Sequence, residues 1–163
     1  MITAEQLQDR LDYDPQTGEF TWIKSMGRVD RTGRVAGTVA HNGYIHIGIK
    51  TDGKKKLYLG HRLAFLWMTG KWPPNEVDHI NGERSDNRWC NLRLATRRQN
   101  CCNKAVRKNN KAGITGVWFD TANQKWACSV DHRWGGRFHC LAQAARKASQ
   151  LTRDQFGEFA RDS

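Results

Sequence analysis

The sequence is short of acidic residues, has no long apolar run and shows no secretory leader. Its 16 Asp and Glu stand against 27 Lys and Arg, a net charge of +11, so a negatively charged partner is expected. No apolar run approaches the roughly 20 residues that span a bilayer, so no membrane partner is expected. The first residues, MITAEQLQDRL, lack the basic-then-apolar order of a signal peptide, which predicts a cytoplasmic protein.

The cysteines also lack the number and spacing of a disulfide or zinc-binding framework. There are five, an odd number, and no two are spaced as a CxxC pair. The adjacent Cys101 and Cys102 cannot easily form two corners of one zinc tetrahedron. Small buried thiols are therefore the favoured interpretation, and zinc is not expected as a cofactor. A structural zinc-bound nucleic-acid module remains an alternative that elemental analysis would decide.

The 163 residues suffice for one ordinary domain or two small ones, and the mixture of patterns predicts an α+β fold. Thr3 and Gln6 form a capping box that opens a short helix, with Leu7 and Leu11 on one face. Alternating segments at 19–22, 44–49 and 56–59 predict strands, the last two joined by a hairpin turn at 51–54, and residues 61–69 predict a helix stopped by Gly70.

The chemistry is concentrated after that helix. Asp78 and His79 are adjacent, and two asparagines, Asn91 and Asn100, follow the histidine by 12 and 21 residues. Residues 76–80 predict a strand entering a turn, and residues 92–95 a second strand. A capping box at 96–99 then places Asn100 in the first turns of a helix. Strand, loop, strand and helix would bring a carboxylate and an amide to one hard divalent ion, beside a histidine base.

The stretch VDHINGERSDNRWCNLRLATRRQN resembles the HNH nucleases of the ββα-metal (His-Me finger) fold, in the branch of phage and intron-borne homing endonucleases. The phrase YDPxTGxFxW near the N-terminus and the HRLA phrase at His61 extend the resemblance. It implies a metal-dependent DNA endonuclease in which His79 is the general base and Asn91 ties down the loop carrying that histidine. Asp78 and Asn100 would hold one ion, magnesium or manganese. Among the competing histidines His41, His46 and His61, only His61 is a candidate to reach the site or the DNA backbone.

A basic segment surrounds this motif. Between residues 84 and 111 there are nine basic residues and one acid, a local net charge of +8 that would attract phosphates. The alternative is a solvated face that keeps the protein soluble, but acids are too sparse for a balanced surface. The predicted DNA contacts of this segment are Arg84, Arg88, Arg93, Arg97, Arg98 and Lys104.

From Gly113 onward, three short strands and an alanine-rich helix at 142–151 are predicted. This part resembles the apetala-two (ethylene-response-factor) type of DNA-binding domain, which implies a three-stranded sheet packed on one helix. Thr115, Trp118, Ser129 and Asp131 depart from the arginines usual in that family, and the link between third strand and helix is shorter. The DNA contacts predicted here are Lys125, Arg133 and Arg137.

The sequence thus predicts a nuclease module at 1–104, a basic linker at 105–112 and a small sheet-and-helix domain at 113–163. The expected function is hydrolysis of phosphodiester bonds in double-stranded DNA by a phage homing endonuclease, in the cytoplasm of an infected bacterium, with no small-molecule substrate. The alternative is a DNA-binding regulator that keeps the nuclease fold without catalysis. Target sequence, nicking against double-strand cleavage, and oligomeric state do not follow from the sequence.

Overall fold

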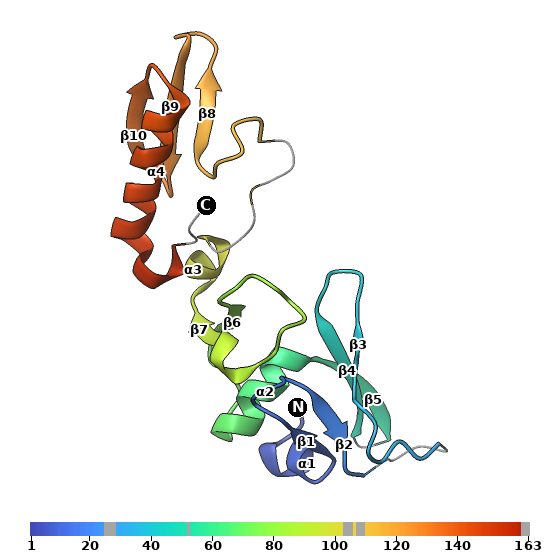
Figure 1. The fold of residues 1–163 in the computed structure, drawn as a ribbon. Coiled ribbons are helices and arrows are strands. Elements are labelled where there is room, and N and C mark those ends of the chain that lie inside the picture. The colour runs from blue at the N-terminus through green and yellow to red at the C-terminus, as the bar shows by residue number, and fades with distance from the viewer. Residues whose placement is uncertain (25–28, 52, 103–105, 107–109, 161–163) are drawn as a thin grey trace. The chain divides into compact units, whose positions relative to one another are not determined.

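The computed structural model describes residues 1–24, 29–51, 53–102, 106 and 110–160 (Figure 1). Its contacts divide the chain into two units, Met1–Thr96 and Arg97–Ser163. The boundary lies before the helix that carries Asn100, whereas the sequence predicts a nuclease module continuing to residue 104. The reason is that this helix, α3 (Arg97–Cys102), contacts α4 and η2 of the second unit. Lys104 and half of the predicted linker, residues 105 and 107–109, lie outside the described residues.

The first unit is built from small antiparallel sheets and two helices. The sheets pair β1 with β2, β3 with β4 and β5, and β6 with β7. In chain order its elements are α1 (Ala4–Gln8), β1 (Leu11–Tyr13), β2 (Phe20–Trp22), β3 (Thr38–Val39), β4 (Ile45–Thr51), β5 (Lys54–Leu59), α2 (Gly60–Thr69), β6 (Glu76–His79), η1 (Trp89–Asn91) and β7 (Leu92–Ala95).

Local sequence signals explain several of these boundaries. The predicted capping box of Thr3 and Gln6 is present, and α2 ends where Gly70 adopts φ +72° and donates its N–H to Leu66. The β4–β5 hairpin places Thr51 opposite Lys54, while Asp52 lies outside the described residues. One expectation was wrong, because α1 ends at Gln8 and Leu11 begins a strand.

A single apolar cluster joins the first unit's elements. It combines α1, β1, β2 and β4 with the inner face of α2 and with β6 and β7. Because α2 presents Leu63, Ala64 and Leu66 to the cluster that also contains Val77, the helix helps to anchor β6, the strand that carries residues 78 and 79. The buried members are Ile2, Leu7, Leu11, Tyr13, Phe20, Ala36, Ile47, Ile49, Leu63, Ala64, Leu66, Val77 and Leu92.

The second unit contains the predicted three strands and helix. After α3 come β8 (Val117–Asp120), β9 (Lys125–Val130), β10 (Arg133–Phe138), α4 (Leu141–Phe156) and η2 (Gly157–Phe159). The sheet order is β10-β9-β8, and α4 packs along the sheet (Figure 1). Only His139 and Cys140 separate β10 from α4, which runs beyond the predicted residue 151 until Gly157 caps it. Within the described residues, no helix is long and apolar enough to cross a bilayer.

The cysteine prediction was largely wrong. Cys128 is buried on the inner face of β9, but Cys90, Cys101 and Cys140 are exposed. The exposed three lie in η1, in the short α3 and in the link before α4, where little chain is available to cover them.

The turn at Asp14–Gly18 docks against the loop that follows β6. Trp89 N–H donates to Pro15 O at 3.0 Å, and Gly18, at φ +77°, lies so close to the Asn87–Arg88 peptide that an added Cβ would approach it to less than 3.0 Å. Glycine is therefore required at this position both by the backbone conformation and by the contact.

Gly18→Ala should destabilise the protein more than Gly33→Ala, which shares φ +77° but has nothing within 4 Å of its would-be Cβ. The Gly33 change should cost about 1 kcal/mol from backbone strain alone, and the Gly18 change should add a steric cost because the Asn87–Arg88 peptide has to move. Urea unfolding followed by tryptophan fluorescence measures both. Equal losses of unfolding free energy would contradict the tight contact.

Candidate active site

The predicted aspartate and histidine end a buried strand. In β6, Val77, Asp78 and His79 are all buried, and β7 pairs alongside with Asp78 opposite Arg93 and His79 opposite Leu92. Ionisable side chains are seldom fully buried unless they have dedicated partners. Each of the two has one.

The partner of Asp78 is Arg93, directly across the hairpin. Arg93 Nε lies 3.0 Å and Nη2 2.9 Å from Asp78 Oδ2. The side chains are only 6% (Asp78) and 14% (Arg93) exposed. This pairing offsets the cost of burying a carboxylate, and it engages Oδ2 in particular. Arg93, predicted as a DNA contact, thus already has an internal carboxylate partner.

Asn91 closes the loop between the two strands. Its Oδ1 accepts the N–H of Asn81 at 3.0 Å, and its Nδ2 donates to Asn81 Oδ1 at 3.0 Å and to Asp86 O at 2.8 Å. The N–H of Ile80, next to His79, donates to Asn91 O at 2.9 Å. One buried amide therefore ties both sides of the loop together immediately after the histidine.

His79 is 4% exposed and is surrounded by polar and aromatic groups. Its Nε2 lies 3.1 Å from Asn87 Oδ1. The His61 ring stands 5.0 Å away at 75°, and the Tyr44 ring 6.0 Å away. Sequence reasoning missed Asn87, which is 2% exposed, although it lies in the DNR phrase that contributes to the family resemblance.

His61 is the one competing histidine that lies beside His79. It is 5% exposed on α2, and its Nδ1 has no hydrogen-bond partner among the described residues. Burial first, and then the nearby His79, lowers the pKa of His61 to about 3. The ring is therefore neutral near pH 7 and contributes packing rather than charge.

Asn100, the second predicted metal ligand, lies on α3 in the second unit. In that unit Arg98 pairs with Asp131 and lies 5.8 Å from the centre of the Phe156 ring. That Asn100 and Asp78 share an ion stays a prediction. Across the residues that the structure describes, no three or more His, Cys, Asp and Glu side chains are grouped so as to hold a metal.

The remaining predicted DNA contacts of the basic segment differ in their surroundings. Arg84 donates to Asn42 O at 2.8 Å and covers the Tyr44 ring at 5.1 Å. Arg88 bonds Asp86 at 2.6 Å and keeps a half-exposed side chain. Arg97 is exposed on α3. Asp86 is already counted in the segment's net charge of +8, whereas Asp78 lies outside the segment, so its pairing with Arg93 offsets one further positive charge.

In the second unit, the three predicted contacts lie on neighbouring strands. Lys125 begins β9, and Arg133 and Arg137 lie on β10. Arg137 bonds Asp120 at 2.7 Å and lies 5.2 Å from the centre of the Trp134 ring.

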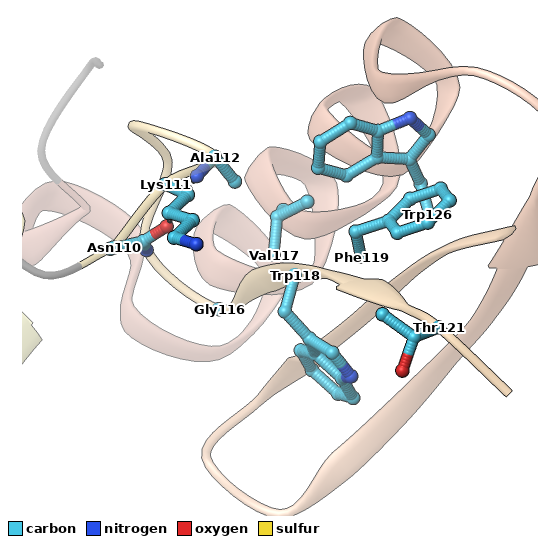
Figure 2. Close-up of a pocket in the computed structure, with 9 residues that line it drawn as sticks. All are labelled: Asn110, Lys111, Ala112, Gly116, Val117, Trp118, Phe119, Thr121 and Trp126. Atoms are coloured by element: carbon cyan, nitrogen blue, oxygen red, sulfur yellow. Dashed lines mark hydrogen bonds between the residues drawn. The ribbon is translucent and has the colours of Figure 1, made fainter. Parts of the chain in front are cut away.

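Exposed aromatic rings lie on the same small sheet. Trp118, Phe119 and Trp134 are 43%, 42% and 54% exposed, and the rings of Trp118 and Trp134 are 6.0 Å apart. Figure 2 shows Val117 and Trp118 pointing to opposite sides of β8, in a pocket that Phe119 and Trp126 also line. Trp118 is therefore not a core residue.

The segment that contains the β6–β7 hairpin is similar to a known family. Residues 58–101 match the family model described as HNH endonuclease, and Asp78, His79, Asn91 and Asn100 all fall inside the match. This supports a DNA-cleaving nuclease as the class of the domain.

A solved structure is similar as well. It is the HNH homing endonuclease I-HmuI, described for its DNA binding and cleavage, with 30% sequence identity, coverage of 56% of this chain and 49% of that chain, and a TM-score of 0.45. The chain therefore spans about half the length of that protein's chain. None of the curated proteins matches it significantly.

The buried His61 predicts a pH-dependent stability. Its pKa is about 3 when folded against 6.5 for an exposed imidazole, so the unfolded chain binds the proton more readily. Stability should be full above about pH 6.5 and fall toward pH 3, by up to about 1.4 kcal/mol per pH unit from this group.

His61→Phe should flatten this slope while keeping the ring contacts, and urea unfolding between about pH 7 and pH 4 measures it. His41→Gln, at an exposed position, should leave the slope unchanged. If His61→Phe and wild type showed the same slope, the imidazole would not be held neutral.

Proposed function

We propose that the chain is a metal-dependent DNA endonuclease of the HNH type, of the kind found in phage homing enzymes. The observation that carries the proposal is the buried Asp78–His79 pair at the end of β6, inside the segment that matches the HNH endonuclease model. Both side chains are placed on a strand rather than a free loop, and Asn91 fixes the turn that follows. Such rigid placement is what acid–base chemistry on a phosphodiester requires.

In the proposed reaction, His79 accepts a proton from the water that attacks phosphorus. The water oxygen forms the new bond to phosphorus, and the bond from phosphorus to the 3′ oxygen breaks. The products are a 5′-phosphate and a 3′-hydroxyl, the latter taking up a proton. His61 excludes water behind the base without competing for the proton, because it is neutral and buried.

The donor set fits a hard divalent ion. Asp78 would provide a carboxylate and Asn100 an amide oxygen to one ion, and such oxygen ligands are the kind that magnesium and manganese prefer. When bound, the ion stabilises the negative charge that develops on the phosphate. The Asp78–Arg93 pair orients the carboxylate by holding Oδ2 at 2.9 and 3.0 Å.

Double-stranded DNA is the proposed substrate, held by exposed basic side chains of both units. Arg84, Arg88, Arg97 and Arg98 are exposed residues inside the matched segment. In the second unit, Arg133 and Arg137 share their strand with the exposed Trp134, as expected for a surface that contacts phosphate and sugar. A protein that binds DNA without cutting it is the competing proposal, and a cleavage assay separates the two.

His79→Ala should leave DNA binding in place and reduce cleavage by about 10²–10⁴-fold, the usual contribution of a general base. The measurement combines single-turnover nicking of plasmid DNA with a gel-shift titration. His41→Ala is the matched control, an exposed histidine of the same unit, and should cut normally. A His79→Ala protein that cuts like wild type would mean that the active site has been assigned to the wrong residue.

Asp78→Asn keeps the size of the side chain and removes its charge. Cleavage should fall by about 10–100-fold or more, and excess manganese should restore part of it if the oxygen binds the ion. Chelation should stop the wild type, and magnesium or manganese should restart it. Asp9→Asn, at a surface pair with Lys24, is the control and should retain full activity. Undiminished cutting in excess chelator would rule out the metal.

A further inference from the structure

Asn87 is the most deeply buried polar side chain at the site, and the proposed chemistry does not yet use it. It is 2% exposed, and its Oδ1 lies 3.1 Å from His79 Nε2. An amide oxygen can only accept a hydrogen bond, so Nε2 has to carry the proton of this contact. In a neutral imidazole the lone pair then lies on Nδ1.

The position of Asn87 is fixed from three distant parts of the chain. Tyr13 Oη donates to Asn87 O at 2.7 Å, and Gly18 abuts the Asn87–Arg88 peptide. On the other side, a Cβ on Gly60 would come within 2.7 Å of Asn87 Nδ2. The amide is therefore confined between the N-terminal turn and the start of α2, which leaves it little freedom to rotate.

The oxygen and the nitrogen of the Asn87 side-chain amide differ in their hydrogen bonding. Its Nδ2 has no hydrogen-bond partner among the described residues, although it is buried. A buried, unpaired donor costs free energy that an apolar side chain of similar size would avoid. The use of asparagine here is explained if the oxygen facing His79 has a function.

The His79 ring is also confined on its faces. His61 stands at 75° to it with ring centres 5.0 Å apart, and Tyr44 lies 6.0 Å away. These contacts restrict tilting of the imidazole, and the Asn87 oxygen selects which nitrogen bears hydrogen.

We propose that Asn87 is a positioning residue that holds His79 in the tautomer protonated on Nε2, so that Nδ1 is the atom that takes the proton from water. This inference rests on the proposed function, since it assigns a role to the partner of the proposed base. The role is comparable to that of the carboxylate in a catalytic triad, which fixes the tautomer of the histidine without itself reacting.

The first test is spectroscopic and uses the intact wild-type chain. The ¹⁵N shifts of His79, assigned by comparison with His79→Ala, should report that the neutral ring carries its hydrogen on Nε2. A neutral ring with its hydrogen on Nδ1 would overturn the proposal, whatever the variants do.

The second test is kinetic. Asn87→Leu removes the acceptor while keeping similar volume, so kcat should fall about 10–100-fold with KM little changed. Asn87→Asp keeps an acceptor oxygen at this position, so its kcat should lie within about 10-fold of the wild-type value. Thr51→Val, which removes another buried polar group on β4, is the matched control and should leave kcat unchanged.

The outcomes separate this inference from the function beneath it. A folded Asn87→Leu protein with wild-type kcat, or a folded Asn87→Asp protein as slow as Asn87→Leu, would overturn the positioning role. If the Asn87 role were overturned but His79→Ala were inactive in the same assay, the proposed nuclease function would still stand. If His79→Ala cut at the wild-type rate, the proposed active site itself would be wrong.

Discussion

The first unit depends on burying an ionisable pair at the end of a short strand. Asp78 and His79 are 6% and 4% exposed, and the partners beside them include Arg93 Nε and Nη2 for the carboxylate and Asn87 Oδ1 for the imidazole. Removing one member of such a buried pair weakens the hydrogen bonding of the other, which costs more than removing both. The packing of α2 and the closure of the loop by Asn91 serve to keep these two contacts in place.

The features that the sequence could predict are those that are determined by residues close together in the chain. Thr3 with Gln6, Gly70 after α2, and the strand–loop–strand pattern around Asp78 are all set by neighbours in the chain, and the structure has these elements. The Arg93–Asp78 pair depends on cross-strand register, and the placement of Asn87 on Tyr13, 74 residues away, depends on tertiary packing. No spacing rule reveals such contacts, which is why the Arg93–Asp78 pair was not anticipated and Asn87 was overlooked.

The charge of the basic segment also depends on contacts that the composition does not reveal. The sequence assigns a local net charge of +8 to the basic segment with Asp86, the partner of Arg88, already counted. The structure adds two carboxylates from outside the segment, because Arg93 pairs with Asp78 and Arg98 with Asp131. Exposed pairs such as that of Arg88 are weak and can exchange a carboxylate for a phosphate, whereas the buried pair of Arg93 cannot do so cheaply. The paired basic residues of the segment therefore divide into exposed ones, Arg88 and Arg98, and Arg93, whose pair with Asp78 is largely buried.

The contact between the Asp14–Gly18 turn and the Asn87–Arg88 peptide has a bearing on biosynthesis. During translation the N-terminal turn leaves the ribosome long before residues 87 and 88, so the histidine lacks its amide neighbour until the hairpin has emerged and packed back on the start of the chain. A nascent polypeptide would consequently carry Asp78 and His79 in an unfinished arrangement. Ordering the chain in this way delays completion of the His79–Asn87 contact until the first unit is fully made.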